Sequence, residues 1–243
     1  METGLIRPNV TKRCVEQCSL GYMIDPNDIK SCVGCTDKCP KECDGFLIDS
    51  LSAAEQFEGC TLVKGDLIIS IQETGASVTT KLEQYLKNIE VITGYLKIVN
   101  SYSLITLHFF RNLREIQGQS LDRTNYSLIV LDNQNLQELF PWKPDEVRKQ
   151  IKIVHGKIFF HLNHKLCMEK IRELNKYADI PPYTTDDVSK LSNGDKAACD
   201  YGKIAIWSIK VDSDMIQIGW ENFANSMVDP RTLLGYYIYY REA

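Results

Sequence analysis

The sequence predicts a mainly β protein with some α-helix, in which stacked coils lie between a cysteine-rich segment and an incomplete β-sandwich. Three observations predict this class. Short apolar strands that end in glycine recur through the middle of the chain, six of the nine cysteines fall between Cys14 and Cys43, and three β-branched or aromatic runs follow Cys199. Only 44 residues follow Cys199, whereas a sandwich takes about 100, so we expect that part to be truncated.

The central repeat consists of short strands that each end two residues before a glycine. The second strand of a unit follows the glycine, in "DLIISI", "YLKIVNSYSLITL" and "KIFFHLN", and it is delayed to "YSLIVLDNQNL" in one unit. A single coil of this kind cannot bury its apolar face, but stacked coils share one core. The first strands are "LVKG" (62–65), "VITG" (91–94), "EIQG" (115–118) and "IVHG" (153–156), with glycine steps of 29, 24 and 38 residues.

Three asparagines follow strands of the repeat by a similar offset, namely Asn100, Asn133 and Asn163. Asparagine side chains bond readily to turn backbone, so we expect them to link adjacent coils, as opposed to serving three unrelated turns. Glycine at the end of each first strand allows a sharp turn between the two sheets. Helical periodicity and caps predict helices over 52–57 with Ser52 as cap, 79–89, 144–151 and 167–178.

The clustered cysteines admit three chemistries: a metal site, a redox pair or disulfides. Cys32-x2-Cys35 is followed after three residues by Cys39-x3-Cys43, which is too close for a four-ligand zinc knuckle. Gly, Thr, Asp, Lys and Pro flank them, unlike the βαβ setting of a redox Cys-x-x-Cys. The segment is polar and has too little core to fold without staples, which favours disulfides and an oxidising compartment. Because the number of cysteines is odd, one cysteine must be free or form a disulfide with a cysteine outside this chain.

Two further patterns admit a functional and a plainer interpretation. His161, His164 and Cys167 recur every three residues and are candidate metal ligands, but the strand character of "KIFFHLN" favours two surface histidines beside a structural cysteine. Asn9-Val-Thr and Asn125-Tyr-Ser are N-glycosylation sequons, although such triplets are common by chance. We therefore expect no metal and no cofactor, and glycans at Asn125 and Asn9.

Charge and hydropathy exclude several classes of function. The net charge of −4 gives no reason to expect a nucleic-acid partner. No apolar run approaches the ~18 residues that a membrane span needs. The first residues lack the features of a signal peptide, so an extracellular chain would need upstream sequence. No Gly-rich phosphate loop, V-A-I-K, H-R-D or D-F-G motif is present in the sequence, which predicts that this chain is not a kinase or another enzyme.

Several long motifs resemble one receptor family. "GYLKIVNSYSLITLHFFRNLREIQG", "NYSLIVLDNQNLQELFPW", "GKIFFHLNHKLC" and "NGDKAAC" closely resemble the second L domain of the insulin and insulin-like growth factor receptors. The tail, with Trp220 and "LLGYYIYYREA", resembles the start of that family's first fibronectin type III domain, and the cysteine segment its furin-like region. The resemblance implies a furin-like end at 1–43, a right-handed β-helix or leucine-rich-repeat-like L domain at 44–199, and a partial fibronectin type III sandwich at 200–243.

The resemblance also implies function and pairings. These receptors are transmembrane tyrosine kinases that bind insulin-like peptides as dimers, so we expect an extracellular arm whose partners are a peptide hormone and a second protomer. The membrane would be reached only through downstream segments. A secreted decoy that binds hormone without signalling is the alternative. Met215 and Gln217 lie at positions where the family has part of a secondary hormone site, but the family has Lys and Leu there. His164 stands where the family typically has a proline. The implied disulfides are Cys18–Cys32, Cys35–Cys39, Cys43–Cys60 and Cys167–Cys199, with Cys14 paired upstream.

Overall fold

The computed structural model divides the chain into two compact units, Met1–Ala197 and Ala198–Ala243, which are described separately. Four of the residues predicted as sites, namely Asn9, Cys14, Cys18 and Cys39, lie outside the part of the chain that the structure describes. The structure describes residues 7–8, 22–25, 28–35, 40–75, 77–123, 125–143, 150–197, 199, 204–212, 215–222, 235–236 and 238.

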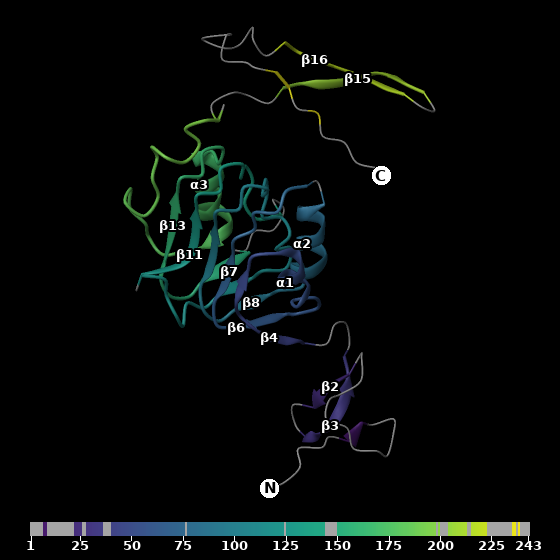
Figure 1. Ribbon diagram of the computed structural model, residues 1–243, viewed down its shortest axis with the longest axis vertical. Helices are drawn as coiled ribbons and strands as arrows, with labels where there is room; N and C mark the ends of the chain where they lie inside the picture. Colours follow the sequence, from purple (N-terminus) through teal and green to yellow (C-terminus); the bar gives the residue numbers. More distant parts are fainter. Residues whose placement is uncertain are drawn as a thin grey trace. The chain divides into compact units, whose positions relative to one another are not determined.

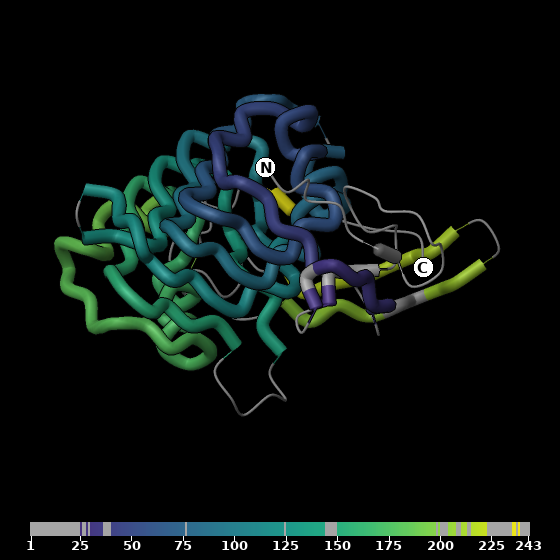
Figure 2. Tube along the Cα trace, turned by 90° about the horizontal axis from the view of Figure 1, so that it is seen from below, coloured from purple at the N-terminus to yellow at the C-terminus, as the bar shows by residue number. Residues whose placement is uncertain are grey.

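Two parallel sheets form the body of the first unit (Figure 1). Each coil gives one strand to each sheet, and successive coils pair in chain order, as the blue-to-green sequence of turns in Figure 2 shows. One sheet comprises β5 (Leu47–Ile48), β7 (Leu67–Ile69), β9 (Leu96–Val99), β11 (Tyr126–Leu131) and β13 (Lys157–His161). The other comprises β4 (Glu42–Asp44), β6 (Leu62–Lys64), β8 (Val91–Ile92), β10 (Glu115–Ile116), β12 (Ile151–Ile153) and β14 (Ala178–Asp179).

The core consists of side chains that stand in register across each sheet. In the five-stranded sheet one buried row runs through every strand, and in the six-stranded sheet a shorter row runs through β6, β8, β10 and β12. Because the strands are parallel and in register, each β-branched or aromatic side chain packs on its equivalent in the next coil. The rows are Ile48–Ile69–Ile98–Val130–Phe160 and Val63–Ile92–Ile116–Ile153.

Three helices were predicted close to their positions. They are α1 (Leu51–Glu55), α2 (Val78–Leu86) and α3 (Met168–Tyr177). The predicted cap of α1 was wrong, because Ser50 rather than Ser52 accepts a hydrogen bond from the Ala53 N–H, at 3.3 Å. A fourth helix was predicted over 144–151. Residues 144–149 lie outside the described part of the chain, and its predicted end is wrong, since Ile151 begins strand β12.

Two strand predictions also need correction. The run "YLKIVNSYSLITL" was expected to be one long strand, but β9 ends at Val99 and the chain turns at Asn100, which has a φ of 51°. The strand expected in "IVHG" begins earlier, at Ile151, and stops at Ile153. In the first run, apolar residues beyond the strand line turns that face the core: Leu104 and Leu107 are fully buried without belonging to a strand.

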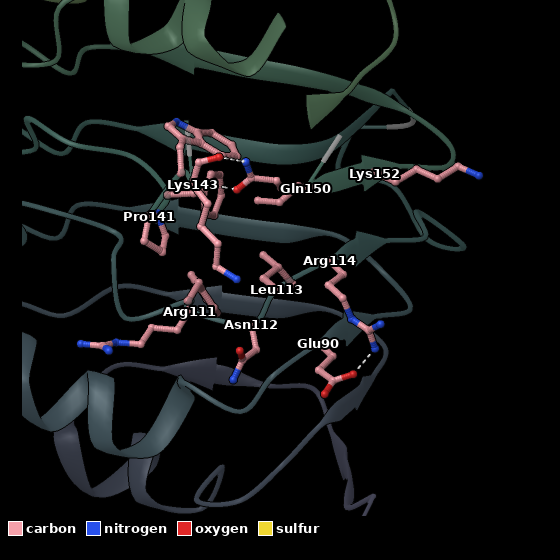
Figure 3. Close-up of a pocket in the computed structure, with 13 residues that line it drawn as sticks. Glu90, Arg111, Asn112, Leu113, Arg114, Pro141, Lys143, Gln150 and Lys152 are labelled. Atoms are coloured by element: carbon pink, nitrogen blue, oxygen red, sulfur yellow. Dashed lines mark hydrogen bonds and ion pairs between the residues drawn. The ribbon is translucent and has the colours of Figure 1, made fainter. Parts of the chain in front are cut away.

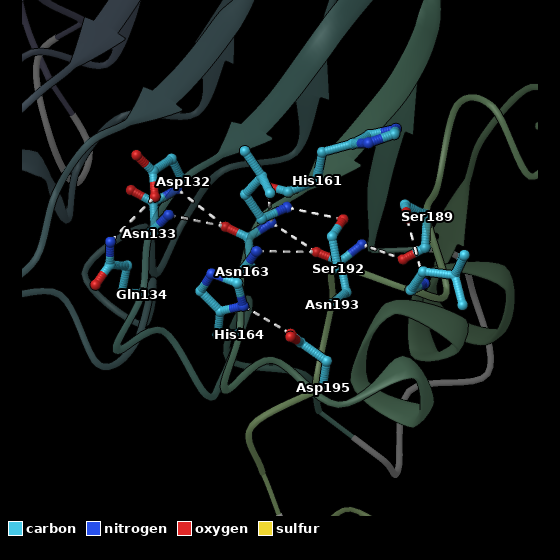
Figure 4. A network of polar contacts seen from close by, with 12 residues as sticks. Asp132, Asn133, Gln134, His161, Asn163, His164, Ser189, Ser192, Asn193 and Asp195 are labelled. Carbon is cyan, nitrogen blue, oxygen red and sulfur yellow. Dashed lines mark hydrogen bonds and ion pairs between the residues drawn. The ribbon is translucent and has the colours of Figure 1, made fainter.

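A ladder of buried side chains holds the turns that follow the five-stranded sheet (Figure 4). The Asn133 N–H donates to Asn163 Oδ1 at 3.2 Å, and the Asn163 N–H donates to Asn193 Oδ1 at 3.3 Å. Each amide also donates a hydrogen bond to the strand of the preceding coil, for example from Asn163 Nδ2 to the Val130 carbonyl at 2.9 Å. The prediction for Asn133 and Asn163 is thus confirmed, while Asn193 had been overlooked.

The prediction for Asn100 was wrong by one residue. Ser101 takes the ladder position in that coil: its N–H donates to Asn133 Oδ1 at 3.1 Å, and its Oγ accepts from the Ile71 N–H at 3.0 Å. Asn100 instead occupies the preceding position, where the backbone is left-handed. Asparagine tolerates that conformation better than most residues, which explains its presence there.

The left-handed position recurs before each of three ladder residues. Asn100, Asp132 and Leu162 have φ values of 51°, 52° and 58°. Asn and Asp suit this region, but a leucine side chain does not, and it costs about 1–2 kcal/mol there. Leu162 is also 43% exposed, so its side chain regains little by burial.

The glycines of the repeat serve different needs. Gly65, Gly118 and Gly156 have positive φ values of 84°, 65° and 81°, which favour glycine over any other residue. Gly94 has no positive φ, but a Cβ there would collide with Asp66 Oδ1 and lie 2.7 Å from the main-chain carbonyl carbon of Gly65 in the preceding coil. The backbone of one coil therefore passes too close to the next for a side chain.

Two small sheets complete the described residues. In the first unit β3 (Asp28–Gly34) pairs with β1 (Arg7–Pro8) in parallel and with β2 (Tyr22–Asp25) in antiparallel fashion. The second unit contains an antiparallel hairpin of β15 (Ile206–Val211) and β16 (Ile216–Trp220). These two strands fall within predicted runs, whereas most of the third predicted strand, "LLGYYIYYREA", lies outside the described residues.

Replacing Asn163 by alanine is expected to lower the free energy of unfolding by about 3 kcal/mol, because two buried backbone groups lose their partners at about 1–3 kcal/mol each. Urea denaturation followed by circular dichroism measures the change. Asn135→Ala is the control, since its amide bonds the Tyr102 carbonyl on the exposed surface. A loss at Asn163 no larger than at Asn135 would contradict the role given to the ladder.

The substitution Leu162→Asn is expected to raise the free energy of unfolding by about 1 kcal/mol, because asparagine removes most of the strain of a left-handed leucine. Thermal melting and urea denaturation both report it. Leu191→Asn makes the same chemical change at a side chain that is 90% exposed and whose φ is not positive, and it should leave stability nearly unchanged. Equal effects at the two positions would mean that loss of surface leucine, and not backbone strain, is responsible.

Candidate functional site

The cysteines are placed as structural staples wherever the structure describes them. Cys43 of β4 and Cys60, which follows α1, form a disulfide with a Cα–Cα distance of 6.0 Å. Cys32, Cys35, Cys167 and Cys199 are also disulfide-bonded. Cys43–Cys60 is a pair that the family resemblance implied; the pairs proposed for Cys18 and Cys39 include residues outside the described part of the chain.

The histidine and cysteine pattern of "HLNHKLC" does not converge on one point. Cys167 is held in a disulfide and so offers no thiolate. The His161 ring stacks on Phe159 with centroids 4.3 Å apart, and its Nε2 lies 2.8 Å from the Asp186 carbonyl oxygen. His164 Nδ1 lies 2.7 Å from Asp195 Oδ1. Within the described ranges, no group of three or more His, Cys, Asp or Glu side chains is arranged to hold a metal ion.

The edge of the five-stranded sheet is covered by residues 184–189. The Phe160 N–H donates to the Asp187 carbonyl at 2.9 Å, and the Ser189 N–H donates to the Phe160 carbonyl at 3.1 Å. A covered edge cannot pair with a strand of another chain. The last coil is therefore closed along β13 by its own chain.

Asp187 anchors this covering segment. Its carboxylate accepts hydrogen bonds from the Thr184 N–H at 2.8 Å, the Thr184 hydroxyl at 2.9 Å and the Tyr126 hydroxyl at 3.0 Å, with Lys157 Nζ at 3.5 Å. Burial alone would raise the pKa of this carboxyl, but the bonds from Thr184 and Tyr126 and the charge of Lys157 outweigh it and hold the pKa below its ordinary value. Tyr126 thereby joins β11 to the last covering segment of the two-sheet body of the first unit, which we call the L unit.

The outer face of the same sheet carries apolar and aromatic side chains. Leu47, Ile68 and Phe159 face outward in register positions that alternate with the buried row, and Leu47 is 47% exposed. The Tyr126 ring packs on Phe159 with centroids 4.8 Å apart. The outer face of this sheet is thus partly apolar.

The residues predicted for hormone contact lie on the hairpin of the second unit. Met215 immediately precedes β16 and is 48% exposed, and Gln217 within β16 is exposed as well. The Met215 carbonyl accepts from the Asp212 N–H at 2.8 Å, which closes the hairpin turn. Exposed apolar side chains accompany them on this hairpin: Ile206, Trp207, Val211 and Ile216.

The predicted glycosylation residue Asn125 is exposed, in the turn before β11. Its N–H donates to the Asp122 carbonyl at 3.2 Å, and its own carbonyl accepts from the Lys157 N–H at 2.7 Å. Main-chain bonds therefore fix the turn.

A cleft of about 420 Å³ opens beside the six-stranded sheet, where the chain enters strands β8, β10 and β12 (Figure 3). Buried Phe110, Leu113, Phe140 and Ile151 contribute its apolar surface, and none of them is more than 4% exposed. Around them lie Arg111, Arg114, Lys143 and Lys152, with Glu90 paired to Arg114. The cleft is completed by Asn112, Pro141, Trp142 and Gln150.

The side chain of Gln150 fixes one wall of the cleft. Its Oε1 accepts from the Lys143 N–H at 2.9 Å and its Nε2 donates to the Lys143 carbonyl at 2.7 Å. Sequence reasoning missed this cleft, because its charges are spread over three coils. The signal was a basic residue just before or within the first strand in "NLREIQG" and "IKIVHG", which becomes visible only once the coils are aligned.

The helices in the described part of the chain are all short, and none is long and apolar enough to span a membrane.

Comparison with known proteins identifies the family whose domain has this architecture. The receptor L domain family matches residues 59–178. An insulin-like peptide receptor of Branchiostoma lanceolatum is 41% identical over 233 residues, which is 95% of this chain and 16% of that protein. The chain carries a receptor L domain of the insulin receptor family.

Two other relatives extend the comparison. The insulin receptor of Xenopus laevis is 37% identical and the insulin-like growth factor 1 receptor of the same species is 35% identical, each over 95% of this chain and 17% of the relative. The chain thus spans about a sixth of the length of the curated relatives that it matches. The part that matches is the L domain region of these receptors, and no kinase domain lies within it.

Replacing Asp187 by asparagine is expected to remove part of the acid sensitivity of the L unit. A carboxyl whose pKa is lowered by folding stabilises the fold above its unfolded pKa of about 4, and that stability is lost as the pH falls through the folded pKa. Urea denaturation at a series of pH values below about 5 should therefore show a shallower decline in the variant. Asp186→Asn, an exposed neighbour, is the control and should keep the wild-type slope; an unchanged slope in Asp187→Asn would contradict the assignment.

Proposed function

We propose that this chain is an extracellular segment of a receptor for an insulin-like peptide, in which the L unit is a rigid arm within the hormone-binding part. The observation that carries the proposal is the 41% identity, over 95% of the chain, to an insulin-like peptide receptor. The proposed partners are the peptide hormone and a second protomer of the receptor. Signalling would pass to a kinase that this chain does not contain.

The internal order of the L unit supports the role of an arm. Its two core rows run unbroken through the coils, and the ladder ties every turn from Ile71 to Asn193 to its neighbour. A solenoid whose coils are linked both through side-chain packing and through hydrogen bonds resists bending between coils. Such a unit transmits a displacement from one end to the other instead of absorbing it.

The proposal includes a domain plan. Residues 1–43 are the end of a furin-like region, residues 44–199 are the L domain with a right-handed coil, and residues 200–243 are the start of a fibronectin type III sandwich. The disulfide of Cys43 with Cys60 and the bonded state of Cys167 and Cys199 support boundaries at both ends of the L domain. The pairings Cys18–Cys32, Cys35–Cys39 and Cys167–Cys199, with Cys14 joined to an upstream cysteine, belong to the same plan.

Surface residues enter the proposal in two ways. The exposure of Met215 and Gln217 leaves both side chains accessible to a hormone at a secondary site. The exposed turn of Asn125 leaves room for an N-linked glycan, and Asn9 is the second glycan site proposed. An unmodified Asn125 in protein secreted by animal cells, measured by peptide mass, would remove the glycan from the proposal.

The test compares peptide binding by two proteins. One is the 243-residue chain, and the other is the same chain within its native flanking sequence, both titrated with a labelled insulin-like peptide. The arm role predicts tight binding by the longer protein and binding at least about 100-fold weaker by the chain alone, because the remaining contacts are missing. Equal, tight binding by both would favour a secreted decoy.

Absence of binding by the longer protein would overturn the receptor proposal altogether. The transcript gives an independent readout, since an open reading frame that continues beyond Ala243 into a membrane span and a kinase fits the receptor. A stop codon soon after Ala243, behind a leader peptide, fits the decoy. Met215→Glu in the longer protein then tests the secondary site and should weaken hormone binding, with Lys196→Glu, at an exposed lysine outside the hairpin, as control.

A further inference from the structure

We propose that a glycan can be attached to Asn125 only before the coil of β12 and β13 stacks on β11, so that folding of this coil closes the acceptor site. The inference rests on the glycan proposed above for Asn125. It goes further, because it says at which stage of folding the glycan is attached and which residues close the site. The observation that carries it is the complete burial of Ser127, whose hydroxyl belongs to the sequon.

The two residues that define the sequon lie in opposite environments. Asn125 is exposed in the turn before β11, where solvent reaches it. Ser127 lies two residues later, within β11, and is 0% exposed. Because the triplet Asn-x-Ser/Thr is an acceptor only as a whole, an enzyme that must recognise the serine cannot use this sequon in the folded chain.

The next coil covers the Ser127 hydroxyl. A Cβ at Gly156 would lie 3.1 Å from Ser127 Oγ, so the backbone of this glycine passes close to the hydroxyl. From Gly156 the chain enters β13, which pairs with β11 and lies beside it in Figure 1. The register of this pairing shifts between Tyr126 and Leu128. Ser127 is therefore covered by the neighbouring coil without having a register partner in it.

Three further contacts hold the chain in place around the sequon. The Asn125 carbonyl accepts a hydrogen bond from the Lys157 N–H at 2.7 Å. The Tyr126 ring packs on Phe159 with centroids 4.8 Å apart, and its hydroxyl donates to Asp187 Oδ1 at 3.0 Å. A movement confined to the turn would leave the serine covered, so exposing its hydroxyl requires the last coil to separate from β11.

The Ser127 hydroxyl contributes no hydrogen bond to the folded chain. Ser127 Oγ is buried and has no hydrogen-bond partner among the residues that the structure describes. A buried hydroxyl without a partner destabilises the folded state, and an alanine would occupy the same position without that cost. The fold therefore gives no reason for a serine here, whereas the sequon of the unfolded chain requires one.

The transfer reaction uses a lipid-linked oligosaccharide as the sugar donor. Asn125 Nδ2 forms a bond to C1 of the first sugar, and the bond between that C1 and the diphosphate oxygen of the lipid breaks. The amide nitrogen loses one proton, and the lipid diphosphate is the leaving group. Nothing is oxidised or reduced. Folding of the last coil decides only whether the transferase can bind the triplet.

The test offers the 243-residue chain, produced without glycans in bacteria, to microsomal oligosaccharyltransferase and a lipid-linked oligosaccharide. One sample is folded with its disulfides intact. The other is reduced and alkylated, and circular dichroism verifies that it is unfolded. Peptide mass after glycosidase treatment gives the occupancy of Asn125. We expect occupancy at least about tenfold lower in the folded sample, because the site is then reached only through rare opening of the last coil.

The substitution Gln72→Asn adds a control sequon to the same chain. It creates the sequon over residues 72–74, all of which are exposed. This sequon should be modified in both samples. Equal occupancy of Asn125 in the two samples would overturn the inference and leave the proposed glycan intact. Modification of neither sequon in the folded sample would also overturn it, because folding would then block transfer in general. An unfolded sample modified at the control sequon but not at Asn125 would overturn the inference and the glycan together.

The substitution Ser127→Ala separates the role of the hydroxyl before folding from any role after it. It should abolish modification of Asn125 in the unfolded sample, and it should leave the melting temperature of the folded chain unchanged or higher, since no hydrogen bond is lost. Ser101→Ala is the matched control and should lower the melting temperature, because Ser101 Oγ accepts from the buried Ile71 N–H at 3.0 Å. An equal fall in both variants would show that the Ser127 hydroxyl serves the fold, and it would contradict the proposal.

Discussion

The L unit depends on one constraint: the main-chain groups of each turn after the five-stranded sheet are buried and need partners from the next coil. The side chains of Ser101, Asn133, Asn163 and Asn193 provide them, and all four residues are at most 2% exposed. Each bond joins residues 30 or 32 positions apart, so the ladder fixes the length of the repeat. In the coil that contains β10 and β11, the extra residues lie in the connection between these two strands, ahead of the ladder position.

The same constraint decides which surfaces are available for function. The turns, the core rows and the β13 edge are committed to internal contacts, whereas the outer face of the five-stranded sheet and the cleft are among the described surfaces that remain open to partners. The second unit behaves differently. Its described hairpin exposes Ile206 to 68% and Ile216 to 67%. A stack of coils with a continuous core and a hairpin with exposed apolar side chains thus occur in one chain, and we propose that only the former acts as an autonomous arm.

The repeat was predictable because glycine and apolar periodicity report directly on backbone geometry. Gly65, Gly118 and Gly156 stand where φ is positive, and their spacing revealed the coils. The ladder was predicted at Asn133 and Asn163 but misplaced at Asn100, because asparagine suits both the ladder and the left-handed position before it. Ser101 was overlooked because a serine side chain can also occupy a ladder position. Asn193 was overlooked because it follows a covering segment and not a strand.

The cleft was not predictable, because nothing local marks it. Arg114 and Lys152 precede or occupy strands of different coils, and their side chains come together only when Glu115 and Lys152 fall into register. The Gln150 side chain holds Lys143 at the cleft through its hydrogen bonds to the Lys143 main chain, and no charge pattern in the sequence indicates this. Local signals therefore recover the features that recur in every coil, whereas a site built from residues of several coils can be recognised only once the register between the coils is known. Since the ladder sets that register, substitutions that alter the ladder should disturb the cleft even though no ladder residue lines it.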